Sequence, residues 1–163
     1  MNKREFLQAG AGLALAGVAI NARAATAGGV MTREEYLRYV TLFNANDPAF
    51  IEYYAPDVVF EVGTTTMQGA TTIRDFYANV KQYIKEEVEV TMFVADANTV
   101  AVEIPTRFEC IRDWQDSFWG VPLKQGQVMR IISWGHYTLV DGKFTTIKSA
   151  RYKLVQDWQF ETA

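Results

Sequence analysis

The sequence predicts an α+β domain: a cone-shaped, curved antiparallel sheet packed against three N-terminal helices. Within the first 84 residues, apolar side chains recur at helical spacing. From residue 87 onward, apolar and polar side chains alternate along segments that end in turn residues, a pattern typical of strands. With 163 residues and 49% apolar side chains, the chain is long enough for one domain with a packed core.

The charge and the rare residue types exclude several classes of protein. A net charge of −3 argues against nucleic-acid binding, and no apolar run approaches the roughly 20 residues that span a membrane. One Cys and one His rule out a disulfide framework and a zinc site built from Cys or from several His. We therefore expect a domain that works without a metal or another cofactor.

The first 24 residues are expected to form a signal peptide. Lys3 and Arg4 precede a small-residue apolar stretch at 9–20, and Ala22-Arg23-Ala24 is a cleavage pattern. Residues 3–8 (KREFLQ) also resemble the twin-arginine export motif, with Lys3 in place of the first Arg, so the export route stays open. We expect a periplasmic or secreted protein, divided into a linker at 25–30, a domain at 31–156 and a tail at 157–163.

The first two predicted helices have start signals. The first helix follows a capping box made by Thr32 and Glu35, and the second, at 48–54, begins at a proline. The third helix is expected at 71–84. A first strand at 58–62 separates the last two helices, and the later strands are expected at 87–95, 99–112, 127–140 and 144–155. The hairpin turn Asp141-Gly142-Lys143 joins the last two of these strands.

Several short motifs follow one another along this order of elements. They are Arg38-Tyr39-Val40, Tyr54-Ala55-Pro56-Asp57, the segment 69–79 and Asp141-Gly142-Lys143. In this order and spacing, the chain from residue 36 to 152 resembles the nuclear transport factor 2-like, or SnoaL-like, superfamily, which includes ketosteroid isomerase. The resemblance implies the cone fold, a ligand cavity between helices and sheet, and a homodimer formed through the outer face of the sheet.

The resemblance also implies roles for three tyrosines. In ketosteroid isomerases, a Tyr of the first helix donates a hydrogen bond to the substrate oxyanion, and two further Tyr support it in some members. Tyr39, Tyr54 and Tyr77 stand at the matching positions. A chain of hydrogen-bonded phenols strengthens its terminal donor, because each bond polarises the next. Alternatively, each of these residues is a core aromatic whose hydroxyl meets backbone or water.

The acids of that isomerase are absent from the matching positions. Val62 stands in place of its proton-shuttling Asp, and Gly135 in place of its second oxyanion acid. Steroid isomerisation needs a base near the substrate, so we do not expect this activity. Limonene epoxide hydrolase shares the fold and uses Asp-Arg-Asp; Arg107-Phe108-Glu109 has a similar spacing, but Ser149 stands in place of the final Asp. Alternation points Arg107 and Glu109 away from the cavity, although a bulge at Pro105 would reverse this.

Strand alternation and the resemblance predict an apolar, aromatic pocket. Arg151 is expected at its mouth, where a guanidinium would bind a carboxylate, a phenolate or a developing oxyanion. The alternative is an outward Arg151 in a salt bridge. The expected substrate-binding residues are Tyr36, Phe43, Phe60, Val62, Ile104, Thr106, Phe108, Trp119, Tyr137, Ile147 and Ser149.

The general base is left open. The candidates are His136, Asp113 and the phenolate of the substrate itself. Alternation places His136 on the outer face of the sheet, and Asp113 belongs to the loop 113–124, which forms either a lid or a surface loop anchored by its aromatic residues.

The favoured hypothesis is an exported, cofactor-free enzyme that uses general acid–base chemistry on a hydrophobic, aromatic small molecule. Tyr39, supported by Tyr54 and Tyr77, would be the acid or oxyanion donor of such a lyase, isomerase or hydrolase. The alternatives are a periplasmic small-ligand-binding domain without catalysis, and an assembly domain that uses the outer face of the sheet.

Overall fold

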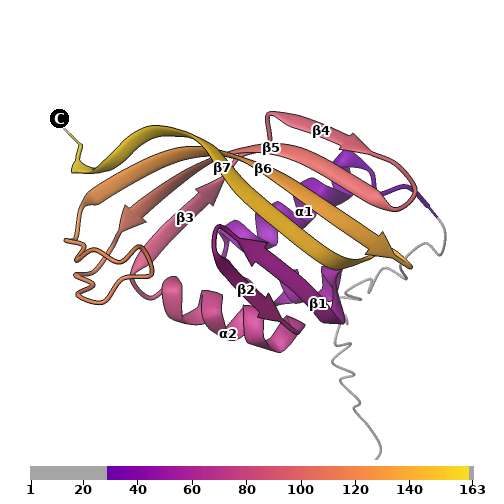
Figure 1. Cartoon of the computed structure of the whole chain (residues 1–163), viewed down its shortest axis with the longest axis horizontal. Coiled ribbons are helices and arrows are strands. Elements are labelled where there is room, and N and C mark those ends of the chain that lie inside the picture. The colour runs from indigo at the N-terminus through magenta and orange to yellow at the C-terminus, as the bar shows by residue number, and fades with distance from the viewer. Residues whose placement is uncertain (1–28, 162–163) are drawn as a thin grey trace, which may run out of the picture.

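The computed structural model describes residues 29–161, so the expected signal peptide lies outside the described residues. It confirms the α+β cone: two α-helices and a 3-10 helix lie against one curled sheet (Figure 1). The elements are α1 (Arg33–Asn44), η1 (Pro48–Tyr53), β1 (Tyr54–Val62), β2 (Thr65–Gln68), α2 (Ala70–Val80), β3 (Ile84–Val88), β4 (Met92–Ala95), β5 (Thr99–Cys110), β6 (Gln127–Val140) and β7 (Lys143–Phe160).

The sheet has the strand order β2-β1-β7-β6-β5-β3, with β4 paired to β5 beyond the end of β3. The pairs are antiparallel except for β1 and β7, which run parallel, so the expectation of a purely antiparallel sheet is corrected to a mixed one. The register between β6 and β7 shifts several times between Val128 and Ser133. Such irregularities increase the local twist, and the long strands curl over the helices (Figure 1).

The helix starts form as the sequence predicts. Thr32 Oγ1 accepts a hydrogen bond from the Glu35 N–H at 3.2 Å, and Glu35 Oε2 accepts one from the Thr32 N–H at 2.8 Å. Asp47 Oδ1 accepts a bond from the Ala49 N–H at 2.9 Å and so caps η1. These caps satisfy N–H groups that have no partner inside a helix, and they position the aromatic face of α1 against the sheet.

The region after α2 differs from the expectation. The helix ends at Val80 rather than at residue 84, because Ile84 already pairs with Cys110 as the start of β3. The single strand expected at 87–95 is two strands, β3 and β4, which pair with successive parts of β5. The break between them lies opposite Pro105, which has no N–H to offer a neighbouring strand. The short strand β2 was not expected.

The hairpin between β6 and β7 confirms the predicted turn. Asp141 and Gly142 have φ angles of 50° and 72°, the left-handed conformation that a two-residue hairpin turn requires. The strand β7 continues to Phe160, which pairs with Gln127, so it includes residues 157–160, where a tail was expected.

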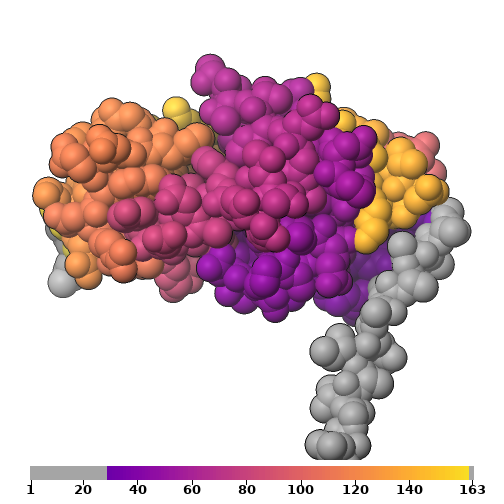
Figure 2. All heavy atoms as spheres, turned by 90° about the horizontal axis from the view of Figure 1, so that it is seen from below, coloured from indigo at the N-terminus to yellow at the C-terminus, as the bar shows by residue number. Residues whose placement is uncertain are grey.

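The main core lies between the helices and the concave face of the sheet. Its most deeply buried members are Tyr36, Val58, Ile73, Val100, Val102, Phe144 and Ile147. A second cluster, centred on Ile84, Cys110 and Leu123, holds the loop between β5 and β6. This loop forms one end of the molecule, beside the segments that contain the helices (Figure 2). Among residues 29–161, no helix combines the length and apolar character needed to cross a membrane.

Candidate functional site

A cavity of about 570 Å³ lies between the two α-helices, the loop and the concave face of the sheet. Its volume falls in the range of small-molecule sites, and most of its wall is apolar or aromatic. Thirteen of the residues expected in the site line it: Tyr36, Tyr39, Phe43, Phe60, Val62, Tyr77, Ile104, Thr106, Phe108, Trp119, Tyr137, Ser149 and Arg151.

Four expected site residues are not part of the cavity wall. Tyr54 lies behind Tyr39 in the core. Ile147 is a buried core residue of β7 and the register partner of Tyr137 on the neighbouring strand β6. His136 is exposed on the outer face, opposite Lys148 of β7. Asp113 is exposed as well.

The surroundings of Asp113 explain why it contributes no carboxylate to the pocket. Asp113 Oδ2 lies 2.8 Å from Lys124 Nζ, and Oδ1 accepts a hydrogen bond from the Gln125 N–H at 2.9 Å. These bonds hold the pKa of Asp113 below its usual value and fix the carboxylate against its own loop. His136 and Asp113 were the two side chains of the protein expected as the general base, and neither of them lies in the cavity.

The phenols form two separate pairs instead of one chain of three. The hydroxyls of Tyr39 and Tyr54 lie 2.9 Å apart, and the Tyr36 hydroxyl donates a hydrogen bond of 2.7 Å to the Tyr137 hydroxyl. Within residues 29–161 the Tyr77 hydroxyl has no hydrogen-bond partner, so the expected three-member network of Tyr39, Tyr54 and Tyr77 is wrong in this respect. The ring of Tyr77 instead packs edge-on against Phe43, with the ring centroids 4.8 Å apart.

Burial keeps these phenols neutral. It raises the pKa of Tyr36, Tyr39, Tyr54 and Tyr77 well above the usual value, and that of Tyr137 to about 12. The hydrogen bond from Tyr36 lowers the pKa of Tyr137 and so partly offsets its burial. Around neutral pH the phenols are therefore hydrogen-bond donors and acceptors, and none of them is a base.

Glu86 is the carboxyl group that the sequence analysis missed. It belongs to β3, pairs with Phe108 of β5 and lines the cavity. Strand alternation carries the signal: Ile84, Glu86 and Val88 share one face, and Ile84 is fully buried. Because we expected the strand to begin at residue 87, we did not apply this alternation to Glu86.

The protonation of Glu86 is unusual for a glutamate. Burial raises its pKa to about 7, and the positive charge of Lys81 acts in the opposite direction. Among the described residues, no hydrogen-bond donor or basic group lies within bonding distance of its carboxylate. Its negative charge also raises the pKa of Tyr39, Tyr77 and Tyr137, which places Glu86 in the same polar region as these phenols.

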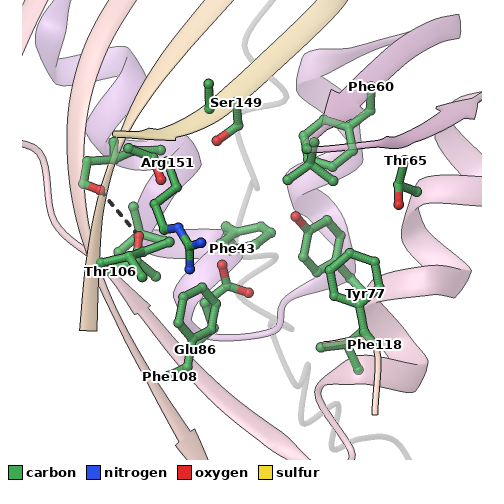
Figure 3. Close-up of a pocket in the computed structure, with 18 of the residues that line it drawn as sticks. Phe43, Phe60, Thr65, Tyr77, Glu86, Thr106, Phe108, Phe118, Ser149 and Arg151 are labelled. Atoms are coloured by element: carbon green, nitrogen blue, oxygen red, sulfur yellow. Dashed lines mark hydrogen bonds between the residues drawn. The ribbon is translucent and has the colours of Figure 1, made fainter. Parts of the chain in front are cut away.

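Arg151 reaches the cavity from β7, where its register partner is Ser133 of β6. Figure 3 shows its guanidinium and the carboxylate of Glu86 pointing toward one another across the pocket. Within residues 29–161, Arg151 forms no salt bridge, so the outward, ion-paired alternative is not what the structure shows. A cation and a carboxyl group thus face the same apolar space.

In the Arg107-Phe108-Glu109 motif, the side chains of Arg107 and Glu109 lie on the outer face of the sheet. Arg107 forms ion pairs with Glu87, Glu109 and Glu161 at 3.3, 2.7 and 3.1 Å. Only Phe108 of this motif lines the cavity, so Arg107 and Glu109 are separated from any ligand there. Within residues 29–161, no group of three His, Cys, Asp or Glu side chains has an arrangement suited to a metal ion.

The fold agrees with the comparisons to known proteins. The model of the SnoaL-like domain family matches residues 36–147, and the chain belongs to this family. No curated protein matches the chain.

Solved structures of similar fold include proteins named for different reactions. A candidate polyketide cyclase of Pseudomonas putida KT2440 has a TM-score of 0.64 and 23% identity, over 77% of this chain and 95% of that one. A candidate polyketide cyclase of Silicibacter sp. TM1040 has a TM-score of 0.63 and 22% identity, over 71% of this chain and 85% of that one. An LEH-like epoxide hydrolase of M. tuberculosis has a TM-score of 0.58 and 14% identity, over 71% of this chain and 78% of that one. At these identities the likeness shows the fold alone.

Proposed function

We propose that this protein is a cofactor-free enzyme that transfers protons on a hydrophobic, aromatic small molecule, with Glu86 as its general base and acid. The observation that carries the proposal is a carboxyl group inside an aromatic cavity that has no hydrogen-bond partner among the described residues. With a pKa of about 7, both of its protonation states are populated at neutral pH. Such a group can accept a proton and return it, which is the requirement of general acid–base catalysis.

The reaction class follows from what the pocket supplies. As a carboxylate, Glu86 would take a proton from a carbon next to a substrate carbonyl group. The electron pair of the broken C–H bond would form an enolate, and the negative charge would move to the carbonyl oxygen. The phenol hydroxyls of the wall would hydrogen-bond to that oxygen, and the protonated Glu86 would return its proton. Return to a different carbon is an isomerisation, and expulsion of a neighbouring group is a lyase reaction.

The ionisable groups that face Glu86 come from both helices and from two strands. Lys81 follows α2, Tyr77 belongs to α2 and Tyr39 to α1, while Tyr137 and Arg151 belong to β6 and β7. The phenols are neutral, so the charges are those of the two basic side chains. Arg151 would orient an anionic group of the substrate or stabilise the enolate.

Hydrogen exchange tests this proposal without knowledge of the natural substrate. The protein is incubated in D₂O with 1-tetralone and 2-tetralone, and NMR follows deuterium uptake at the carbon next to the carbonyl group. We expect catalysed exchange, reduced by about 100-fold or more in Glu86→Gln. Glu87→Gln is the matched control, because Glu87 is the next residue and forms ion pairs with Lys85 and Arg107 outside the cavity.

Two outcomes would contradict the enzyme proposal. Equal exchange rates for wild type and Glu86→Gln would remove Glu86 from proton transfer. Binding of the ketones with no catalysed exchange would favour the ligand-binding domain instead.

We also propose that the protein is exported after removal of residues 1–24. The support is the sequence pattern of this segment. Expression in a bacterial host, followed by mass measurement of the periplasmic protein, is expected to give a chain that begins at Ala25. An uncleaved cytoplasmic chain would contradict the export proposal.

A homodimer formed through the outer face of the sheet is the third element of the proposal. Trp134 and Tyr152 stack there with ring centroids 5.3 Å apart, and each is more than 40% exposed. Light scattering is expected to give twice the mass of one chain, and Trp134→Glu is expected to produce monomers. A wild-type monomer would refute the dimer.

A further inference from the structure

Within residues 29–161, the hydroxyl of Tyr137 lines the cavity, accepts a hydrogen bond from Tyr36 and keeps its own proton free. Tyr36 donates to it at 2.7 Å, and no acceptor for the Tyr137 proton is found within residues 29–161. The rings of the two residues meet edge to face, with centroids 5.3 Å apart. A hydroxyl that accepts one hydrogen bond becomes a stronger donor of its own proton, because the first bond polarises it.

Gly135 explains how Tyr137 holds this position. The two residues lie on the same face of β6, and the Tyr137 ring lies over the glycine. A Cβ at position 135 would lie 3.0 Å from Tyr137 Cε2, 3.4 Å from its hydroxyl oxygen and 2.9 Å from Val102 Cγ2. The contact with Val102 is closer than real Cβ atoms show and the contact with the Tyr137 ring is tight, so a side chain at position 135 would require Val102 and Tyr137 to shift.

We propose that Tyr137, with Tyr36 as its positioning residue, donates the hydrogen bond that binds an oxygen atom of the ligand as it becomes negatively charged. This inference rests on the proposed function, and it assigns the donor to a different phenol pair from the Tyr39–Tyr54 pair expected from the sequence. Tyr137 lines the cavity, and Glu86 lies near enough for its charge to raise the pKa of Tyr137. A phenol donor and a proton-transferring carboxyl group would then act on the same ligand. The ligand class is an enol, a phenol or another aromatic compound whose oxygen carries developing negative charge.

Binding of naphthols tests the donor separately from proton transfer. The probes are 2-naphthol, two more acidic ring-substituted 2-naphthols, and 2-methylnaphthalene, which has no oxygen. Binding is measured by fluorescence in the Glu86→Gln background, where the proposed base is absent. In this parent Glu86→Gln protein at one neutral pH we expect affinity to rise with the acidity of the naphthol. A more acidic naphthol is ionised to a larger extent at that pH, and an ionised oxygen accepts a stronger hydrogen bond than a neutral hydroxyl.

Replacement of Tyr137 by Phe removes the donor and keeps the ring. We expect Tyr137→Phe to weaken 2-naphthol binding by about tenfold and to reduce the dependence of affinity on acidity, with 2-methylnaphthalene binding unchanged. Tyr36→Phe is expected to reduce that dependence by a smaller amount. A loss of packing alone would weaken the binding of every probe equally and leave the dependence on acidity unchanged. Tyr53→Phe is the matched control, because Tyr53 is an aromatic neighbour of Tyr39 that does not line the cavity.

Gly135→Ala is a second variant that keeps the hydroxyl and displaces it. It is expected to lower naphthol affinity and to leave 2-methylnaphthalene binding less affected. Near-ultraviolet circular dichroism shows that each variant is folded.

Three results would overturn the assignment. The first is an unchanged acidity dependence in Tyr137→Phe. The second is a loss of naphthol affinity in Tyr77→Phe or Tyr39→Phe while Tyr137→Phe binds naphthols as before. The third is a parent protein that does not bind naphthols. Because Glu86 takes no part in this measurement, none of these results is produced by failure of the proton-transfer proposal.

Discussion

The ammonium group of Lys81 lies 3.9 Å from the centroid of the Phe43 ring, at the wall of the cavity. Lys81 also donates a hydrogen bond to the Phe43 carbonyl group, so its charge is held in place from two directions. This fixed charge lowers the pKa of Glu86 and opposes the effect of burial. The protonation of the proposed base therefore depends on a side chain that does not itself line the cavity.

Replacement of Lys81 by Met tests this dependence. Without the positive charge, only the effect of burial remains, and the pKa of Glu86 is expected to rise above its value of about 7. The pH at which catalysed exchange begins is expected to rise with it, and the pH–rate profile is the measurement. Lys85→Met is the control, because Lys85 is exposed and pairs with Glu87. An unchanged profile in Lys81→Met would disprove the coupling.

Burial of Glu86 predicts a stability that depends on pH. A raised pKa means that the folded protein binds more protons than the unfolded chain between pH 4.5, the ordinary pKa of a glutamate, and about pH 7. Stability is therefore expected to fall as pH rises through this window, by about 3 kcal/mol at most. Urea unfolding at pH 5 and pH 8 measures the effect.

Glu86→Gln is expected to remove this part of the pH dependence and to make the protein more stable than wild type at pH 8. A Gln side chain cannot ionise, so the cost of burying a charge disappears. Wild type and variant with the same loss of stability between the two pH values would contradict the assignment of the buried charge to Glu86.

The hydrogen bond between Tyr39 and Tyr54 predicts an energetic coupling. Tyr39→Phe and Tyr54→Phe are each expected to lower the free energy of unfolding by about 1 kcal/mol, because each leaves one buried hydroxyl without its partner. The double variant is expected to lose less than the sum, with a coupling of about 1 kcal/mol in a double-mutant cycle measured by urea unfolding. Strict additivity would show that the bond contributes nothing.

The two candidate bases that lie outside the cavity are expected to be dispensable. His136→Ala and Asp113→Asn are predicted to leave the exchange rate within about twofold of wild type, since neither side chain lines the cavity. Their stabilities are expected to change little, because both residues are exposed. A large loss of activity in either variant would show that the site extends beyond the cavity described above.

Local rules predicted much of the fold, because they act through neighbours in the sequence. The capping box at Thr32, the hairpin turn at Asp141 and the inward face of β6 all formed as expected. Glu86 was missed because its orientation depends on where β3 begins, and Ile84 pairs with Cys110, 26 residues further along the chain. The pairing of the phenols also could not be predicted, because Tyr36 and Tyr137 meet only through the curl of the sheet.

The ionisation of Glu86 itself is the most direct test of the central claim. Carbon-13 NMR of protein labelled at the glutamate side-chain carboxyl group follows each resonance from pH 3 to pH 9, and Glu86→Gln identifies the signal that belongs to Glu86. We predict a midpoint of about 7. A midpoint between about 4 and 5, that of an ordinary solvated glutamate, would contradict the proposal that Glu86 is the proton-transferring group.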